Sequence, residues 1–286
     1  PIMLTLGGST TSGFYQHISD GETYPKVLAS LAKDDFFVVN GGVGAYSSLQ
    51  EFYKFVRDGS RFENLKVVIS LNGINDLPNY HALPGQQHRE RQRSKKIREH
   101  DYPFMTHIQY SMNSRQMWID QRYWHFSSIF PNFFSLFNNV VERAKRKKFN
   151  TDIDYSIEAA EGIFNAVSAV ERWEKNVTRL QRLVELESAK YFVFLQPNLA
   201  LEGVQSKAPP GTKDAEILAT IEADYIIEIQ KLYRELKSRC RRLAFCFDIS
   251  DSVPPTGNEY NDRRHHNAEG NKLLAKKIWS IVSENL

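Results

Sequence analysis

Five short apolar segments constrain the fold of this chain more than any other feature. They are rich in Val, Ile, Phe and Tyr, and they are nearly continuous rather than alternating, as is typical of parallel strands buried on both faces. The segments are IMLTL (2–6), FFVVN (36–40), KVVISL (66–71), KYFVFLQ (190–196) and RLAFCFDI (242–249). The sequence therefore predicts a five-stranded parallel sheet.

Helical patterns separate and follow these segments. They cover about 24–33, 47–58, 156–187, 213–239 and 268–284. The last pattern follows Asn267, a good N-cap residue, and has Glu269 in its first turn, where a carboxylate is favoured. Strands that alternate with helices in this way indicate a doubly wound, three-layer α/β/α domain.

One long interval, about 83–154, contains no strand pattern. An interval of about 70 residues is too long for a structureless loop in a compact domain. We therefore predict a mostly helical insertion within a single domain that spans 1–286. The interval is rich in aromatic residues between Tyr102 and Phe137. We interpret them as the packing core of the insertion rather than as a lid or a membrane-facing surface.

Two basic clusters lie in the same interval. RERQRSKKIR (89–98) has six basic residues against Glu90, and RAKRKK (143–148) follows it. Such charge runs are usually solvated helix faces, so neither cluster indicates a nucleic-acid-binding protein. Proximity of the insertion to a membrane or another anionic surface, such as acidic glycans, stays open.

The two cysteines, Cys240 and Cys246, indicate neither a disulfide framework nor a zinc site. We expect Cys240 at the end of a helix and Cys246 inside a strand, and we interpret both as core or boundary residues. No apolar stretch reaches the roughly 18 residues that a membrane span needs, and no signal peptide is present. Because a core strand follows Pro1 at once, a removed upstream anchor and a location at the cell envelope or a membrane stay open.

Polar or glycine-rich segments follow all five predicted strands. They are GGSTTSG (7–13), NGGVGAYSS (40–48), NGINDL (72–77), PNLALEG (197–203) and NDRRHHNAEGN (261–271). Ligands of an open parallel sheet bind beyond the carboxyl ends of its strands. We therefore predict one site at this edge, built from Ser9, Asn75, Asp262 and His265.

The first of these segments does not fit a phosphate-binding loop. Gly8 and Gly13 have the spacing of a P-loop, but Phe14 and Tyr15 stand where that loop needs Lys and Ser or Thr. The dinucleotide-binding pattern G-x-G-x-x-G is absent from the segment as well. We predict no cofactor and, because no metal-ligand spacing occurs, no metal ion.

Ser9 is instead interpreted as a nucleophile. A serine hydroxyl needs a base to take its proton, and the base needs a partner that fixes its tautomer. Asp262 and His265 are three residues apart, so one turn can direct the carboxylate to Nδ1 and leave Nε2 for Ser9. Oxyanion donors would be the Ser9 N–H, an N–H of the glycine-rich turn after the second strand, and the Asn75 amide.

Four motifs in this order resemble the SGNH, or GDSL-like, hydrolase superfamily. GGST with Ser9 is similar to the first sequence block of that family, and NGGVGAYSS to the second. GIND with Asn75 is similar to the third block, and DRRH with Asp262 and His265 to the last. The resemblance covers the α/β core and implies a flavodoxin-like SGNH hydrolase fold. It also implies that Ser9, Asp262 and His265 are catalytic.

Two blocks depart from the family pattern near the nucleophile. Gly8 stands where Asp is usual, as in a GGST-type subgroup that resembles membrane-linked glycan-modifying proteins. The oxyanion glycine of the second block aligns with Ala45. The resemblance therefore implies an oxyanion hole of Ser9, Ala45 and Asn75, with Gly44 as the alternative to Ala45.

The last block contains two adjacent histidines. His266 replaces a common Pro and competes with His265 for the role of base, although the D-x-x-H spacing favours His265. In the third block, we interpret Asp76 as a structural hydrogen-bonding residue rather than as a catalyst.

The resemblance implies a serine esterase that hydrolyses an O-acyl ester, with O-acetyl on a carbohydrate or surface glycan as the leading case. A glycan O-acyltransferase, a lysophospholipase and other lipid esterases would use the same residues. An inactive module that binds a glycan or a partner is the alternative from another class. The acyl group, the acceptor, the oligomeric state and the compartment stay open.

Overall fold

The structure, a computed structural model, describes residues 1–13, 19–76 and 166–286. Its strands are β1 (Ile2–Gly7), β2 (Phe37–Asn40), β3 (Leu65–Asn72), β4 (Lys190–Leu195) and β5 (Cys246–Asp248). Its helices are α1 (Ser9–Ser12), α2 (Tyr24–Leu31), α3 (Ser48–Asp58), α7 (Ala166–Leu186), α8 (Lys213–Ala219), α9 (Ala223–Cys240) and α10 (Ala268–Glu284), with short 3₁₀ turns η1 (Asp20–Glu22), η2 (Gly59–Arg61), η3 (Ile74–Asp76) and η4 (Gln205–Lys207). The predicted insertion lies outside the described residues, so its helical character and the single-domain organisation stay predictions.

The five strands form one parallel sheet in the order β2-β1-β3-β4-β5. This is the flavodoxin-like strand order. From β1 the chain first adds β2 on one side and then adds β3, β4 and β5 on the other, so the switch point lies between β1 and β3. In the middle of the sheet, Val68 of β3 pairs with Leu4 of β1 and with Tyr191 of β4. The predicted parallel sheet is therefore confirmed.

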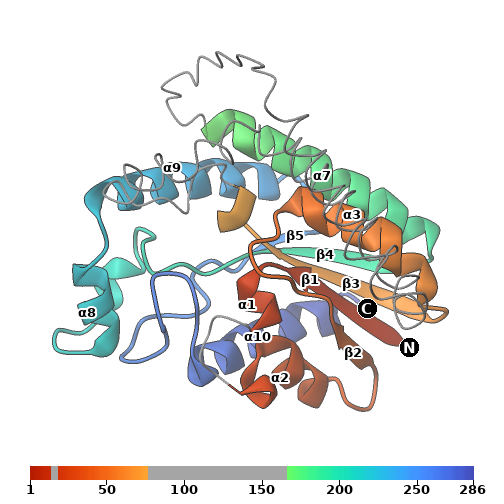
Figure 1. Cartoon of the computed structure of the whole chain (residues 1–286), viewed down its shortest axis with the longest axis horizontal. Coiled ribbons are helices and arrows are strands. Elements are labelled where there is room, and N and C mark those ends of the chain that lie inside the picture. The colour runs from red at the N-terminus through yellow and green to blue at the C-terminus, as the bar shows by residue number, and fades with distance from the viewer. Residues whose placement is uncertain (14–18, 77–165) are drawn as a thin grey trace, which may run out of the picture. The chain divides into compact units, whose positions relative to one another are not determined.

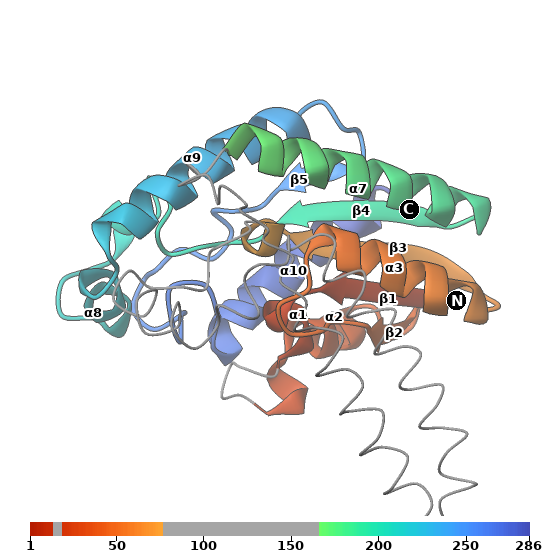
Figure 2. The same ribbon diagram turned by 45° about the horizontal axis from the view of Figure 1, so that its top comes forward.

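Helices cover both faces of this sheet (Figures 1 and 2). Helices α3, α7 and α9 lie on one face, and α2 and α10 lie together on the other. Each long helix presents an apolar stripe to the sheet, because apolar side chains recur at intervals of three or four residues. On α7 the buried residues Trp173, Val177, Leu180 and Val184 form this stripe. The three-layer α/β/α architecture predicted from the alternation is confirmed.

The N-cap predicted for α10 is also present. The Asn267 side chain accepts hydrogen bonds from the backbone N–H groups of Glu269 at 2.9 Å and Gly270 at 3.0 Å. These bonds satisfy amides that have no partner within the helix. The cap fixes where α10 begins, immediately after the segment that carries the two histidines.

Two element boundaries differ from the prediction. The pattern at 213–239 is divided into α8 and α9, because Glu222 has extended backbone angles (φ −65°, ψ 138°) and starts a new helix. The strand predicted at 242–249 is reduced to Cys246–Asp248. Residues 241–245 instead form tight turns, in which Leu243 N–H donates to the Cys240 carbonyl at 3.0 Å.

These turns correct the interpretation of the two cysteines. Cys240 and Cys246 are joined by a disulfide, with their Cα atoms 5.2 Å apart. The interpretation as unlinked core or boundary residues was wrong because a strand starting at residue 242 would have carried the chain away from α9. The observed chain reversal brings the end of α9 back to the start of β5, within the Cα separation that a disulfide requires.

Replacing both cysteines with alanine should lower the free energy of unfolding. A short closed loop restricts the unfolded chain, and its release is expected to cost about 2 kcal/mol. Chemical denaturation measures this loss of stability. Wild type and the Cys240→Ala, Cys246→Ala double variant are each compared with and without reductant. Reductant should lower the stability of the wild type alone; equal curves for all four samples would contradict the prediction.

Candidate active site

Ser9 is presented by a tight turn at the carboxyl end of β1. It follows Gly8 directly and is the first residue of α1. The turn closes at Gly13, a left-handed residue (φ 76°) whose N–H donates to the Ser9 carbonyl at 2.9 Å. Gly7, at φ 150°, has a backbone conformation that side chains with a Cβ rarely adopt. The glycines in this segment therefore serve the turn that exposes the serine.

A chain of two hydrogen bonds connects Ser9 to Asp262 through His265. The Ser9 Oγ and His265 Nε2 atoms are 2.7 Å apart. On the other side of the ring, His265 Nδ1 and Asp262 Oδ2 are 2.6 Å apart. A carboxylate accepts only, so the hydrogen-bond network assigns the ring proton to Nδ1 and leaves Nε2 as the acceptor that faces the hydroxyl. The structure thus brings together the three residues predicted from the sequence.

Asp262 is held in its ionised state. Burial raises its pKa, but three influences outweigh burial and lower the pKa to about 2: the hydrogen bond from His265, the charge that this ring has when it is protonated, and the backbone N–H groups of Arg264 and His265. Both N–H groups donate to Asp262 Oδ1 at 2.9 Å. The carboxylate that faces the imidazole is therefore both charged and fixed in orientation.

His266 occupies a different environment from its neighbour. Its side chain is fully buried against Tyr260, with ring centroids 4.9 Å apart, and neither ring nitrogen has a hydrogen-bond partner among the described residues. Burial, reinforced by the charge of His265, lowers the pKa of His266 to about 3. The hydrogen bond to Ser9 is made by His265, so the geometry favours His265 as the base.

Asn75 lies beside the nucleophile turn. It belongs to η3, which follows β3, and its Nδ2 atom donates to the Tyr46 carbonyl at 3.0 Å. The amide has two N–H groups, so one of them is not used by this bond. A Cβ atom built on Gly8 would overlap Asn75 Nδ2. The absence of a side chain at position 8 therefore allows the amide to approach the backbone that leads into Ser9.

Ala45 has an unusual backbone conformation. Its φ of 63° places it in the left-handed region, where Gly44 does not lie. Outside glycine this conformation costs roughly 1–2 kcal/mol, and strain of this kind is often found at functional sites. The turn that holds Ala45 is fixed to the nucleophile turn, because Val43 N–H donates to the Gly7 carbonyl at 3.0 Å. The choice between Ala45 and Gly44 as the oxyanion donor of the second block stays a prediction.

Asp76 has the structural role expected of it. Its Oδ1 atom accepts hydrogen bonds from the Ser48 backbone N–H, at 3.1 Å, and from the Ser48 hydroxyl. Asn176 of α7 donates to the same hydroxyl at 3.1 Å. Asp76 therefore anchors the start of α3 to η3, the turn that carries Asn75.

A buried acid that the sequence did not single out lies below this turn. Glu51 of α3 is 1% exposed, and its Oε1 atom accepts a hydrogen bond from Asn72 Nδ2 at 2.7 Å. Asn72 in turn accepts from Trp173 Nε1 at 3.2 Å. Burial raises the pKa of Glu51 to about 8, and the hydrogen bond from Asn72 acts against this rise. Glu51 lies on the buried face of α3, together with Ser48 and Phe55. No sequence motif marks it.

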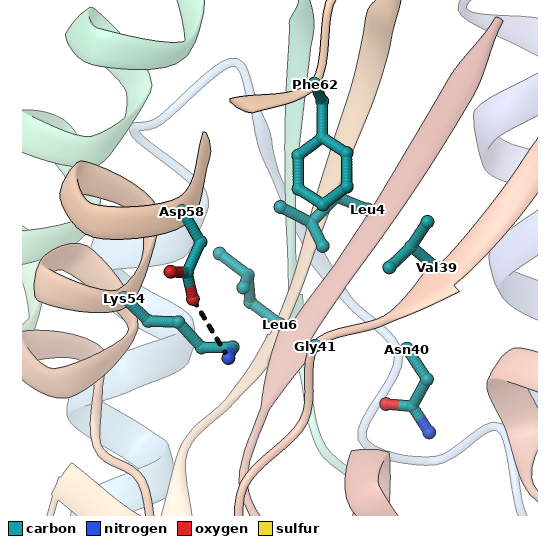
Figure 3. A pocket seen from close by; sticks show the side chains of 8 residues that line it. All are labelled: Leu4, Leu6, Val39, Asn40, Gly41, Lys54, Asp58 and Phe62. Carbon is teal, nitrogen blue, oxygen red and sulfur yellow. Dashed lines mark hydrogen bonds and ion pairs between the residues drawn. The ribbon is translucent and has the colours of Figure 1, made fainter. Parts of the chain in front are cut away.

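One described cavity lies away from this site. It has a volume of about 100 Å³ and lies between β1, β2 and α3, with the ion pair of Lys54 and Asp58 at one side. Figure 3 shows the residues that line it. The cavity is lined by Leu4, Leu6, Val39, Asn40, Gly41, Lys54, Asp58 and Phe62. None of these residues belongs to the predicted set.

The described part of the chain contains neither a metal-binding cluster nor a membrane-spanning helix. Within 1–13, 19–76 and 166–286, His, Cys, Asp and Glu side chains form no group of three or more that could hold a metal ion. No helix in the same part of the chain is long and apolar enough to cross a membrane.

Several solved structures are similar to this chain at low sequence identity. A member of the lipolytic protein G-D-S-L family from Veillonella parvula is 9% identical, with a TM-score of 0.51 over 98% of this chain and 97% of that chain. A carbohydrate acetylesterase family member from Sinorhizobium meliloti is 12% identical, with a TM-score of 0.48 over 99% and 97% of the chains. The psychrotrophic esterase EstA from Pseudoalteromonas sp. is 10% identical, with a TM-score of 0.47 over 99% and 98%.

No protein-family model and no curated protein matches the sequence. The likeness to the Veillonella parvula protein spans nearly the full length of both chains and assigns the fold. The chain has the α/β fold of the SGNH, or GDSL-like, hydrolases, as the sequence motifs predicted.

Replacing Gly8 with alanine should impair catalysis without unfolding the protein. The new methyl group meets the end of a side chain, Asn75 Nδ2, so the amide is displaced while the sheet is undisturbed. The sequence predicts Asn75 to be an oxyanion donor, and loss of one such donor typically lowers kcat by about 100-fold or more. We expect a fall in kcat of at least about tenfold for hydrolysis of p-nitrophenyl acetate, with little change in Tm. Gly257→Ala, where a Cβ has open space, is the matched control; equal activity of the two variants would contradict the prediction.

Glu51 should make the protein less stable as the pH rises. The unfolded chain releases this proton near the ordinary pKa of 4.5, whereas the folded protein keeps it up to about 8. Between these values the unfolded state binds fewer protons, so the free energy of unfolding falls by up to about 1.4 kcal/mol per pH unit.

Urea denaturation across this pH range tests the assignment. Glu51→Gln should remove the slope, so that the variant is more stable than wild type near pH 8 and the difference shrinks towards pH 4.5. The exposed Glu202→Gln is the control. If the free energy of unfolding changed with pH in parallel for wild type and Glu51→Gln, the Glu51 carboxyl group would not cause the pH dependence.

Proposed function

We propose that the protein is a serine esterase of SGNH type that hydrolyses O-acyl esters of carbohydrates. The observation that carries this proposal is the hydrogen-bond chain from Ser9 Oγ through the His265 ring to Asp262. A hydroxyl, an imidazole and an ionised carboxylate in this order activate a serine nucleophile. The fold shared with the GDSL protein supports the same chemistry.

In the proposed acylation step, Ser9 is the nucleophile and His265 is the base. Ser9 Oγ attacks the ester carbonyl carbon while its proton passes to His265 Nε2, 2.7 Å away. Asp262 stabilises the imidazolium that forms. The negative charge on the carbonyl oxygen is met by the N–H groups of Ser9 and Ala45 and by the Asn75 amide. The Ser9 amide is suited to this role because the first N–H of a helix has no acceptor within it.

Collapse of the tetrahedral intermediate completes acylation: the ester bond to the alcohol breaks, and the alcohol leaves with the proton from His265. In deacylation, water attacks the acyl group on Ser9 and gives its proton to His265. The second tetrahedral intermediate then collapses: the bond from Ser9 Oγ to the acyl carbon breaks, His265 returns its proton to Ser9 Oγ, and the carboxylic acid leaves.

The substrate class rests on the first block of the sequence. GGST, with Gly8 in place of the usual Asp, is similar to the motif of a subgroup that resembles glycan-modifying proteins. This similarity supports an acetylated carbohydrate as the substrate. The Cys240–Cys246 disulfide supports an oxidising compartment, such as the cell envelope, where surface glycans are found.

A fluorophosphonate probe should label wild-type protein at Ser9. Ser9→Ala and His265→Phe should not be labelled, because the first lacks the nucleophile and the second lacks its base. His266→Phe is the matched control, since that ring is fully buried and makes no hydrogen bond among the described residues. It should be labelled at close to the wild-type rate. Labelling that persists in Ser9→Ala, or is lost only in His266→Phe, would contradict the assignment.

Acetate release from acetylated oligosaccharides separates hydrolysis from transfer. The proposal predicts release in water without any added acceptor, and no release by Ser9→Ala. Acetate transfer that occurs only with a sugar acceptor would overturn hydrolysis in favour of an acyltransferase. Labelling at Ser9 together with cleavage of lysophospholipids alone would overturn the carbohydrate assignment and keep the esterase chemistry.

A further inference from the structure

Gln196 is a buried polar residue that the motifs do not include. It directly follows β4, at the edge of the sheet where Ser9 and His265 lie, and is 4% exposed. A polar side chain at such a position is costly to bury unless its hydrogen bonds are made. Its partners therefore indicate what it does.

The Gln196 amide bridges the two segments that carry the reacting atoms. Its Nε2 atom donates to Thr10 Oγ1 at 2.8 Å and to the Arg264 carbonyl at 3.0 Å. Thr10 follows Ser9, and Arg264 precedes His265. The partners are 186 and 68 residues away along the chain, so no local structure could hold these segments together.

The backbone of Gln196 adds a third segment. Its N–H donates to the Asn72 carbonyl at 2.8 Å, and its carbonyl accepts from the Tyr233 hydroxyl at 2.7 Å. That hydroxyl would lie 2.8 Å from a Cβ on Gly73, the residue after β3. These backbone contacts hold the strand that leads to Asn75. They do not depend on the side chain, so a substitution can separate the two functions.

The chemistry of the bridge requires an amide. The Arg264 carbonyl can only accept, so the group that faces it must be a donor, and the same nitrogen has a second hydrogen for Thr10 Oγ1. An ionised carboxylate of the same length has no donor. A thioether has a similar volume and no N–H group.

We propose that Gln196 is a positioning residue for the proposed esterase reaction. Its side-chain amide holds the Ser9 turn and the His265 segment at the spacing that proton transfer requires. The inference rests on the proposed function. It adds a group that touches neither the substrate nor the reacting atoms and acts through Thr10 and Arg264.

Gln196→Met tests this inference, with Gln205→Met as the matched control. Gln205 also donates from Nε2 to a backbone carbonyl, that of Ala200 at 2.9 Å, but it contacts neither reacting segment. A misplacement of about 1 Å at a catalytic pair can lower the rate by about 100-fold. We expect Gln196→Met to lower kcat for p-nitrophenyl acetate and the rate of fluorophosphonate labelling by about 10-fold to 100-fold, with KM within about twofold. Gln205→Met should leave kcat unchanged.

Thr10 provides a second, independent measurement. Thr10→Val removes the acceptor hydroxyl and should lower kcat in part, whereas Thr10→Ser keeps the hydroxyl and should restore it. Because both act on one bridge, Gln196→Met combined with Thr10→Val should be no slower than Gln196→Met alone. The comparison of Thr10→Val with Thr10→Ser does not use Gln196→Met and remains decisive if that variant fails to fold.

The outcomes separate this inference from the proposed function. Wild-type protein that labels at Ser9, with Gln196→Met labelling at the same rate, would overturn the positioning role alone. Equal losses of kcat in Gln196→Met and Gln205→Met would reduce Gln196 to a structural residue and overturn it as well. Wild-type protein that neither labels at Ser9 nor cleaves esters would overturn the proposed function and this inference with it.

Discussion

The candidate site depends on the alignment of the carboxyl ends of three neighbouring strands. Gly7 of β1 pairs with Leu71 of β3, and Asn72 pairs with Leu195 of β4. The chain therefore leaves the sheet at the same level after each strand, and the segments that follow can touch one another. A register slip of one residue would turn alternate side chains to the opposite face of the sheet. The backbone hydrogen bonds between the strands therefore determine where along the strands the site lies, independently of the side chains at the site.

The side-chain amide of Asn75, the predicted oxyanion donor, closely approaches the backbone of the nucleophile turn. The Asn75 amide occupies the space that a side chain on Gly8 would fill, and the Tyr233 hydroxyl lies against Gly73 in a similar way. Gly8 directly follows β1, and Gly73 directly follows β3. The space they leave is filled by polar groups from other elements, so each glycine is needed for packing as much as for turning.

Much of the site could be predicted from local sequence. The apolar segments gave the strands to within a few residues, and the D-x-x-H spacing placed Asp262 and His265 three residues apart on one turn. Ser9, Asn75 and these two residues each follow a strand, and the parallel-sheet rule was enough to group them. The shortened β5 was not predicted because the apolar residues 243–245 form part of a chain reversal, and composition alone does not distinguish a reversal from a strand.

The sequence by itself determined the α/β architecture and the residues of the candidate triad, because hydrophobic period and motif spacing are local properties of the chain. Only the tertiary structure decided the disulfide between Cys240 and Cys246, the full burial of His266 beside His265, and the bridge made by Gln196. Each of these features depends on where a side chain points after distant segments have packed. A buried amide such as Gln196 has its role only through partners far away in sequence, and no local pattern encodes that distance.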